Sequence, residues 1–438
     1  MSLMLRGADK NYFYISIAFL TAVIYYLITE YIITDKQFGV PLDDTWIHFR
    51  YAENFAKGFF FHYNINEPTP GTSSPLWVII LSPAFFFSIN PTAYSLIISS
   101  IFFLLTCIEV YKLCLKFGLE RNFALIAALI TLLSGRLLWS SLSGMEITLF
   151  CFLSVLIIRL HLYEIENKKL YKLQGLFLGL ASITRPEGLL LTAVYFTVSI
   201  ILFRKSLKEN FINLFTSVFL FLITISPYAV FSYLQTGGFL PNTFKGQGGE
   251  LRFLPDVNFL RETGQLFFGD NLLILFLWFA SILYFFYTIF KGKIEIHFLI
   301  INLWLILLPL ISSILVPNWR HHGRYLIPLI PFVNIISVHL VQKIYAGFKK
   351  KNLKTLTLIR NAFVTILFLL TIKSTVIFAN AIGWNADNIN KQQVNIANWL
   401  NNNLTEEKAF GLNDIGAITF ITKKRIVDMA GLVTPEVF

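Results

Sequence analysis

The stretch NYFYISIAFLTAVIYYLITEYII at residues 11–33 decides the class of this chain, because it is long and apolar enough to cross a lipid bilayer as a helix. Its apolar run, from Tyr12 to Ile33, exceeds the roughly 7–15 residues of a signal-peptide core, so we expect it to be a retained span.

The composition extends this interpretation to the whole chain. The 438 residues are 55% hydrophobic and only 14% charged, and the mean hydropathy is +0.65. Soluble domains usually carry about 25% charged residues. The 45 Phe residues raise the aromatic share to 16%, more than soluble cores can bury. A soluble enzyme, a disordered chain and a disulfide scaffold are therefore excluded, and we predict an all-α polytopic membrane protein.

Apolar runs of spanning length recur and predict about eleven transmembrane helices. They cover residues 11–33, 93–115, 122–140, 146–163, 170–184, 186–203, 211–234, 271–290, 296–316, 324–345 and 356–379. The short pair on either side of Arg185-Pro186 predicts a tight hairpin, since proline ends a helix. Residues 75–89 are apolar but stop at Asn90-Pro91, and we expect them to form a re-entrant segment rather than a full span.

The positive charge of the chain predicts its orientation. The formal net charge is +11, and the sharpest basic clusters are Arg204-Lys205 and Lys349-Lys350-Lys351. Basic clusters between apolar runs are typical of cytoplasmic loops and do not require a nucleic-acid partner. We therefore predict a cytoplasmic N-terminus in an inner (cytoplasmic) membrane. Cys107, Cys114 and Cys151 lie in apolar stretches without metal-ligand spacing and are interpreted as membrane-embedded side chains.

This orientation places three polar pieces outside the cell membrane, at residues 34–74, 235–270 and 380–438. We predict a membrane module over residues 1–379 and a small extracytoplasmic segment over 380–438. In that segment Val394, Ala397 and Leu400 form a helical stripe, and Lys424–Met429 resembles a short strand, so we expect a small α/β cap.

The first outer loop contains the first candidate acids, Asp43 and Asp44 in DDTWIHFRYA, followed by His48, Arg50 and Tyr51. One Asp could simply cap a helix. Capping needs only one carboxylate, however, and a carboxylate at a dry membrane boundary has a raised pKa and can act as a general base.

Glu146, in SSLSGMEITLF, is the second candidate, because acids at the entry of an apolar span are costly unless they are paired or functional. Its structural alternative is a favourable charge at a helix N-terminus.

Basic residues on the same predicted face could bind a phosphate. Arg side chains suit phosphate oxygens, and a low dielectric strengthens each contact. The candidates are Arg185 beside Glu187, Lys245, and Arg324 after Arg320-His321-His322. The structural alternatives are an internal salt bridge between Arg185 and Glu187 and solvated loop charges. Adjacent histidines cannot easily bind one ion, so they give only a weak metal signal.

Six motifs in order then identify a resemblance. They are LDDTWIHFRYAENFAKG, SGMEITLF, TRPEGLLL, LPNTF, GRYLIPLIPF and NDIGAITF followed by RIVDMAGLVTPE. Together with the GTSSPLW re-entry, they resemble the GT-C superfamily of membrane glycosyltransferases, which use polyprenyl-phosphate sugars. The arabinofuranosyltransferase-like and mannosyltransferase-like bacterial members are the most similar in pattern.

The resemblance implies roles for individual residues. Asp43 would be the catalytic carboxylate, with Asp44 beside it and Glu146 as the second acid, while Arg185 and Arg324 would lie near the lipid phosphate. The implied substrate-binding set is completed by His48, Arg50, Tyr51, Glu187, Asn242, Lys245 and His322. Lys245 departs from the family pattern, in which an aromatic residue often follows LPNTF. The chain also ends at Phe438, soon after GLVTPE, which implies an absent or shortened acceptor-recognition part.

These observations predict transfer of a sugar from a polyprenyl-monophosphate donor to a hydroxyl of a glycan, lipid or protein acceptor on the outer membrane face. We expect a single inverting displacement with Asp43 as base. A divalent cation, Mg²⁺ or Mn²⁺, could be held by Asp43 and Glu146 with Asp44 nearby. Two alternatives remain open at this point: a transporter or flippase of lipid-linked sugars, and a non-catalytic assembly protein that binds partners through its Asn-rich tail.

Overall fold

The computed structural model describes residues 10–239, 253–293, 295–315, 321–348, 353–434 and 437. Its long helices are α1 (Lys10–Ile33), α2 (Asp43–Ala56), α5 (Pro91–Lys116), α6 (Arg121–Leu132), α8 (Ile147–Asn167), α9 (Gln174–Thr184), α10 (Glu187–Phe203), α11 (Leu207–Thr236), α13 (Val257–Phe290), α14 (Ile296–Leu315), α15 (Ile330–Phe348) and α16 (Leu353–Ile389). The shorter elements are β1 (His62–Asn64), β2 (Glu67–Pro68), α3 (Pro75–Leu81), α4 (Pro83–Phe86), α7 (Gly135–Ser141), η1 (Arg204–Ser206), η2 (His321–Gly323), η3 (Ile327–Leu329), η4 (Asn390–Val394), α17 (Asn395–Asn403), β3 (Ala409–Leu412), α18 (Gly416–Thr422) and β4 (Arg425–Asp428).

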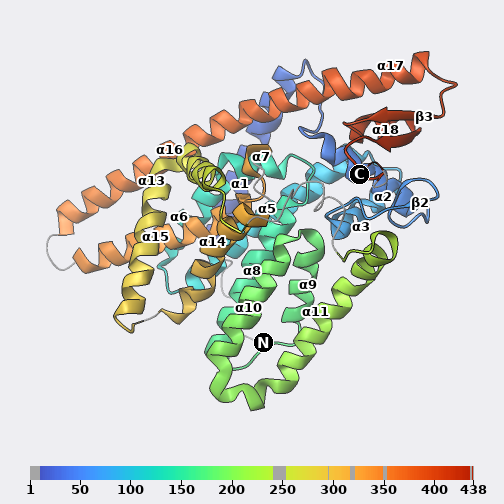
Figure 1. Cartoon of the computed structure of the whole chain (residues 1–438). Helices are drawn as coiled ribbons and strands as arrows, with labels where there is room; N and C mark the ends of the chain where they lie inside the picture. The colour runs from blue at the N-terminus through green and yellow to red at the C-terminus, as the bar shows by residue number, and fades with distance from the viewer. Residues whose placement is uncertain are drawn as a thin grey trace.

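The helices confirm a polytopic membrane protein. Among the described residues, eight helices are long and apolar enough to cross a membrane, or nine if the bent pair α6 and α7 is one span. Every predicted apolar run falls on helical segments, but the run 122–140 is divided between α6 and α7, and α9 has only 11 residues. At about 1.5 Å per residue it is too short for a hydrocarbon core of about 30 Å. Helices α10 and α11 are joined directly by the short turn η1, and Figure 1 shows them running in opposite directions.

The segment predicted to be re-entrant forms α3 and α4, which together cover only Pro75–Phe86. Twelve helical residues extend about 18 Å, which is shorter than a bilayer core. The segment therefore does not form a full crossing. The second predicted outer loop, 235–270, includes the first part of α13, which begins at Val257 and is interrupted by non-helical Asn271. Asp256 caps this helix through a hydrogen bond from the Phe259 N–H (3.0 Å).

The C-terminal segment contains the predicted strand and helix. Strand β4 covers Arg425–Asp428 and pairs in parallel with β3, and α18 connects the two strands. The predicted helical stripe lies on η4 and α17, where Ala397 is fully buried. Figure 1 shows α16 and α17 as one long helix, with α18 and β3 beside α2 and β2 of the first loop. Because this helix runs continuously through residue 380, the division of the chain at 379/380 stays a prediction.

Helices α9 and α11 pack so closely that only glycine fits at their contact. A Cβ atom built on Gly175 would lie 1.7 Å from the backbone oxygen of Ser217, which is buried on α11. Small residues that allow two backbones to approach are typical of membrane helix interfaces. This contact holds α9 against α11 and thereby fixes the end of α9, where Arg185 follows.

We expect Gly175→Ala to lower the thermal stability of the protein in detergent, because the added methyl group forces α9 and α11 apart. Overpacking of this kind costs about 1–3 kcal/mol. Gly264→Ala is the matched control, since no atom lies within 4 Å of a Cβ at that helical glycine. Alanine favours a helix over glycine by up to about 1 kcal/mol, so the control should keep or raise the melting temperature. Equal melting temperatures for the two variants would contradict the close contact.

Candidate active site

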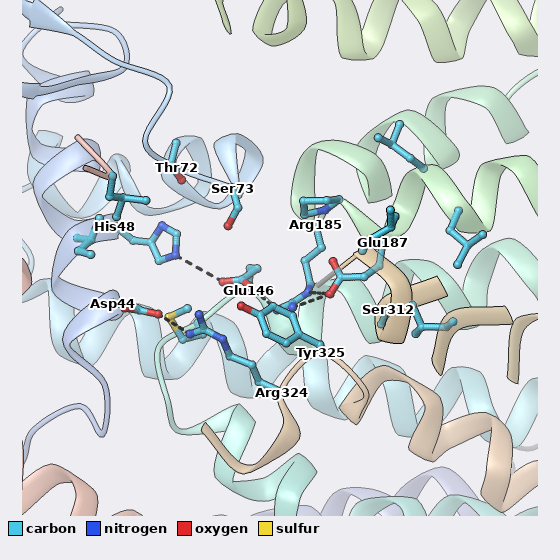
Figure 2. Close-up of a pocket in the computed structure, with 18 of the residues that line it drawn as sticks. Asp44, His48, Thr72, Ser73, Glu146, Arg185, Glu187, Ser312, Arg324 and Tyr325 are labelled. Atoms are coloured by element: carbon cyan, nitrogen blue, oxygen red, sulfur yellow. Dashed lines mark hydrogen bonds and ion pairs between the residues drawn. The ribbon is translucent and has the colours of Figure 1, made fainter. Parts of the chain in front are cut away.

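A cavity of about 270 Å³ lies where the first loop, the ends of helices α8, α9, α10 and α14, and the C-terminal segment meet. Figure 2 shows its labelled side chains converging from both sides. Its lining includes Asp44, Ile47, His48, Gly71, Thr72, Ser73, Met145, Glu146, Arg185, Pro186, Glu187, Leu189, Leu190, Leu308, Ile311, Ser312, Leu315, Arg324, Tyr325 and Leu432. One part is ionisable and polar, whereas α10 and α14 contribute mainly aliphatic side chains. The cavity can therefore accept a molecule with a charged group and an apolar chain.

Arg185 lies at the centre of the polar part, and the sequence explains its position. The following proline excludes the helical conformation, so Arg185 is extended (φ −152°, ψ 143°) and ends α9. Its Nη1 donates to Glu146 Oε1 at 2.7 Å, and its Nη2 donates to Glu187 Oε1 at 2.8 Å. Arg185 is only 4% exposed, so these carboxylates compensate a buried charge.

Glu146 precedes the first turn of α8 and bridges two cavity walls. Besides Arg185, its Oε2 lies 3.5 Å from His48 Nε2 on α2. Burial alone would raise the pKa of Glu146, but the contact with His48 and the charge of Arg185 outweigh burial and lower the pKa to about 2. Glu146 is therefore ionised at neutral pH. An ionised group with so low a pKa suits charge pairing better than proton transfer.

Arg324 approaches the cavity from the turn between η2 and η3. Its Nη1 donates to Asp44 Oδ2 at 2.5 Å, and its guanidinium carbon lies 5.4 Å from the ring centre of Tyr325. The guanidinium carbon of Arg185 lies 5.4 Å from the same ring, so both cations flank one aromatic side chain. Arg324 is 6% exposed, and its Nε has no hydrogen-bond partner among the described residues. A buried, unsatisfied N–H group beside a cavity is suited to an anionic ligand.

The two adjacent acids of the first loop point to different places. Asp44, Ile47 and His48 follow helical i, i+3, i+4 spacing and face the cavity together. Consecutive residues of a helix point about 100° apart, so Asp43 faces elsewhere. Its Oδ2 accepts the N–H of Gly416 at 2.7 Å and its Oδ1 accepts that of Ala417 at 2.8 Å. Burial raises the pKa of Asp43 to about 6, although both N–H groups pull it down.

The structure brings together six of the predicted site residues, namely Asp44, His48, Glu146, Arg185, Glu187 and Arg324. Asp43 does not line the cavity, and its predicted catalytic role stays a prediction. Asn242 and Lys245 lie outside the described residues.

Three further predicted binding residues do not line the cavity but contact the segments around it. Arg50 donates to the backbone oxygen of Tyr63 (3.2 Å). The Tyr51 hydroxyl accepts the N–H of Gly71 (3.2 Å) and thereby holds a lining residue. His322 adopts a left-handed conformation (φ 61°), and its backbone oxygen accepts a hydrogen bond from Arg136. These contacts fix the segments that carry the lining residues.

Other lining residues were missed from the sequence. Tyr325 follows Arg324 in GRYLIPLIPF, and Thr72 and Ser73 belong to GTSSPLW, so their motifs were visible but their roles were not. The aliphatic wall of α14 was recognised only as a span. Leu432 comes from the C-terminal segment, and no local pattern predicts that it reaches the cavity.

The carboxylates that line the cavity are paired with arginines in this structure. Asp44 and Glu146 both pair with arginines, and the described chain contains no group of three His, Cys, Asp or Glu side chains that could hold a metal ion. Three carboxylates nevertheless face two guanidinium groups, so the cavity's charge is compatible with a cation. Metal binding by Asp43 and Glu146 stays a prediction.

Comparison with solved structures identifies the fold. ArnT from Cupriavidus metallidurans bound to undecaprenyl phosphate is similar with a TM-score of 0.64 at 13% identity, covering 95% of this chain and 88% of ArnT. The oligosaccharyltransferase AglB from Archaeoglobus fulgidus, in complex with an inhibitory peptide and a dolichol-phosphate, gives 0.60 at 14% identity, over 96% of this chain and 65% of AglB. The Archaeoglobus fulgidus oligosaccharyltransferase in complex with Zn and sulfate gives 0.61 at 16% identity, over 94% of this chain and 62% of that one.

Sequence comparison adds less. No curated protein matches the chain. A family described as a domain of unknown function, DUF8728, matches residues 387–438, which is the C-terminal segment alone. The structural likeness confirms the predicted fold: the chain has the GT-C membrane fold, with a small α/β part at its C-terminal end.

Proposed function

We propose that this protein transfers a glycosyl group from a polyprenyl-monophosphate sugar to an acceptor hydroxyl. The observation that carries the proposal is the two-sided cavity. Two buried arginines lie in its polar part, and Leu189, Leu308 and Ile311 are among the aliphatic residues that line it. A lipid phosphate has the matching chemistry, with an anionic headgroup on an isoprenoid chain. Solved proteins of this fold were bound to undecaprenyl phosphate and to a dolichol-phosphate, which supports the same ligand class here.

Asp44 is the general base in this proposal, in place of its neighbour Asp43. Asp44 lines the cavity and its side chain is 35% exposed, whereas both oxygens of Asp43 accept backbone N–H groups. The acceptor hydroxyl attacks the anomeric carbon and gives its proton to Asp44, while the bond from that carbon to the phosphate oxygen breaks. The electron pair leaves with the phosphate, and the anomeric configuration inverts.

Arg324 and Arg185 stabilise the charge that develops on the departing phosphate. Arg324 is bonded to Asp44 in the structure, and its buried Nε has no hydrogen-bond partner among the described residues. Binding of the donor phosphate to Arg324 would weaken its hold on Asp44. In this proposal, that change favours proton transfer from the acceptor hydroxyl to Asp44 and so couples donor binding to catalysis.

The proposal places the cavity on the extracytoplasmic face of the cell membrane. Helix α10 begins at the cavity with Glu187 and ends at the basic turn Arg204–Ser206. Its 17 residues separate these ends by about 25 Å. Because basic loops favour the cytoplasm, this distribution supports an outward-facing cavity and a cytoplasmic N-terminus.

The decisive experiment is a transfer assay with the purified full chain in detergent. Undecaprenyl phosphates carrying radiolabelled mannose, glucose, galactose or arabinose are incubated with membranes that supply acceptors. We expect at least one label to enter a covalent product that no longer partitions with the lipid donor. A flippase would move the same donors across vesicles without forming a covalent product, and that outcome would reject the proposed transferase.

A further inference from the structure

The C-terminal segment forms part of the cavity wall. Leu432 lines the cavity, and Asp428, which is 1% exposed, fixes the turn that carries it. Asp428 Oδ1 accepts the N–H of Ala430 at 2.9 Å, and its Oδ2 accepts that of Val433 at 3.0 Å. A Cβ atom on Gly71 would lie 2.8 Å from Val433 Cγ1, so this turn packs directly on the first loop.

Side chains of the first loop hold the same segment at several points. Asn64 makes two hydrogen bonds with the backbone of Ile426, at 2.9 and 3.0 Å, and the Tyr63 hydroxyl donates to the backbone oxygen of Ile415 at 2.8 Å. Lys423 pairs with Glu53 at 2.6 Å. The ring of Phe420 packs against α2, including Trp46 at a centroid distance of 5.4 Å.

Asp43 makes the contact that is nearest to the reacting groups. Both of its oxygens accept N–H groups from the first residues of α18, and a Cβ atom on Gly416 would lie only 2.1 Å from the backbone oxygen of Asp43. The backbones of α2 and α18 therefore touch at the residue that directly precedes Asp44. A shift of α18 must move the first turn of α2, and with it the carboxylate in the cavity.

We propose that Asp43 is a positioning residue, which ties α18 to the first turn of α2 and so holds Asp44 and the Leu432 wall at the cavity. This inference rests on the proposed transferase. The two adjacent acids then have different roles: Asp44 is the general base, and Asp43 positions Asp44. The C-terminal segment is then a required part of the catalytic unit and not an independent partner-binding tail.

Two substitutions break the same contact from opposite sides. Asp43→Asn keeps one acceptor oxygen and loses the other, whereas Gly416→Ala leaves both acids of the loop intact and pushes α18 away. We expect each to lower kcat about 10- to 100-fold, because misplacing a catalytic group by about 1 Å can cost about 100-fold. The KM for the lipid donor should change little. Gly411→Ala, on β3 with no atom within 4 Å of the added methyl group, should transfer at the wild-type rate.

The double variant separates positioning from chemistry. If both residues act through one contact, Asp43→Asn combined with Gly416→Ala should lose no more activity than either single variant. Wild-type kcat in Gly416→Ala, together with a loss in Asp43→Asn as large as in Asp44→Asn, would overturn the inference and make Asp43 the base. An inactive wild type and an inactive Gly411→Ala would instead reject the proposed function.

Hydrogen exchange tests the contact without any transfer. In the full-length Asp43→Asn protein, amides of the peptide containing Gly416 and Ala417 should exchange faster than in wild type, while peptides from α8 stay unchanged. This measurement applies even if Gly416→Ala does not fold. Unchanged exchange at α18 would overturn the inference.

Discussion

Asp44→Asn is expected to reduce sugar transfer by about 10²–10⁴-fold, which is the usual contribution of a general base. Asparagine has nearly the same shape and can still accept the hydrogen bond from Arg324, but it cannot take a proton from the acceptor hydroxyl. Binding of undecaprenyl phosphate should persist, since the variant removes no cation from the cavity. The measurement is the initial rate of label transfer at saturating donor, with lipid binding measured on the same preparation.

Asp35→Asn is the matched control for this variant. Asp35 lies just after α1, is exposed and has a positive φ of 50°, a conformation that asparagine adopts readily. It should therefore transfer at the wild-type rate. If Asp44→Asn also keeps wild-type turnover, Asp44 is not the base, and the proposed chemistry of the cavity is wrong.

The membrane architecture could be predicted from the sequence because it depends on local properties. Spanning length and hydropathy place the apolar part of each described helix of membrane-spanning length, and an X-Pro pair places the break at Arg185. The same local reasoning located β4 within a residue or two at each end. At residues 257–270 the structure has a capped helix, and non-helical Asn271 separates it from the apolar helix that follows.

The arrangement of the site was only partly predictable, because it depends on contacts between distant segments. The i, i+3, i+4 spacing of Asp44, Ile47 and His48 was available in the sequence and would have separated Asp44 from Asp43. By contrast, the partners of Asp43 are the N–H groups of residues 416 and 417. Almost every residue type has a backbone N–H group, so a sequence motif cannot show which of these groups bind a carboxylate. The contact between Asp43 and α18 could therefore not be predicted.

The ion pairs of the site were also only partly predictable, because most of them join distant segments. A bridge between Arg185 and Glu187 was one alternative, and it exists, yet Arg185 also bonds Glu146 and lines the cavity. The two alternatives therefore do not exclude each other. Structural pairing holds the guanidinium in place, and its position in the cavity lets it serve a ligand.

Arg324→Gln is expected to weaken binding of undecaprenyl phosphate by about 10- to 100-fold, since a hydrogen bond to a charged group contributes about 1.5–3 kcal/mol. Arg324→Lys should lose less, because it keeps the charge but not the planar fork that matches phosphate oxygens. Asp44, the partner left behind, is partly solvated with a side chain 35% exposed, so the fold should tolerate the change. Lipid binding can be followed by equilibrium titration of the purified protein in detergent.

Two controls show whether this loss belongs to the phosphate. Undecaprenol has the same chain without a charge, so its binding should be equal in wild type and Arg324→Gln if the guanidinium contacts the headgroup. Arg204→Gln, at the exposed turn between α10 and α11, should bind undecaprenyl phosphate as wild type does. Equal losses for undecaprenol and undecaprenyl phosphate would mean that Arg324 shapes the cavity rather than binding the anion. In that case Arg185, with its two carboxylate partners, would be the remaining buried arginine known to line the cavity.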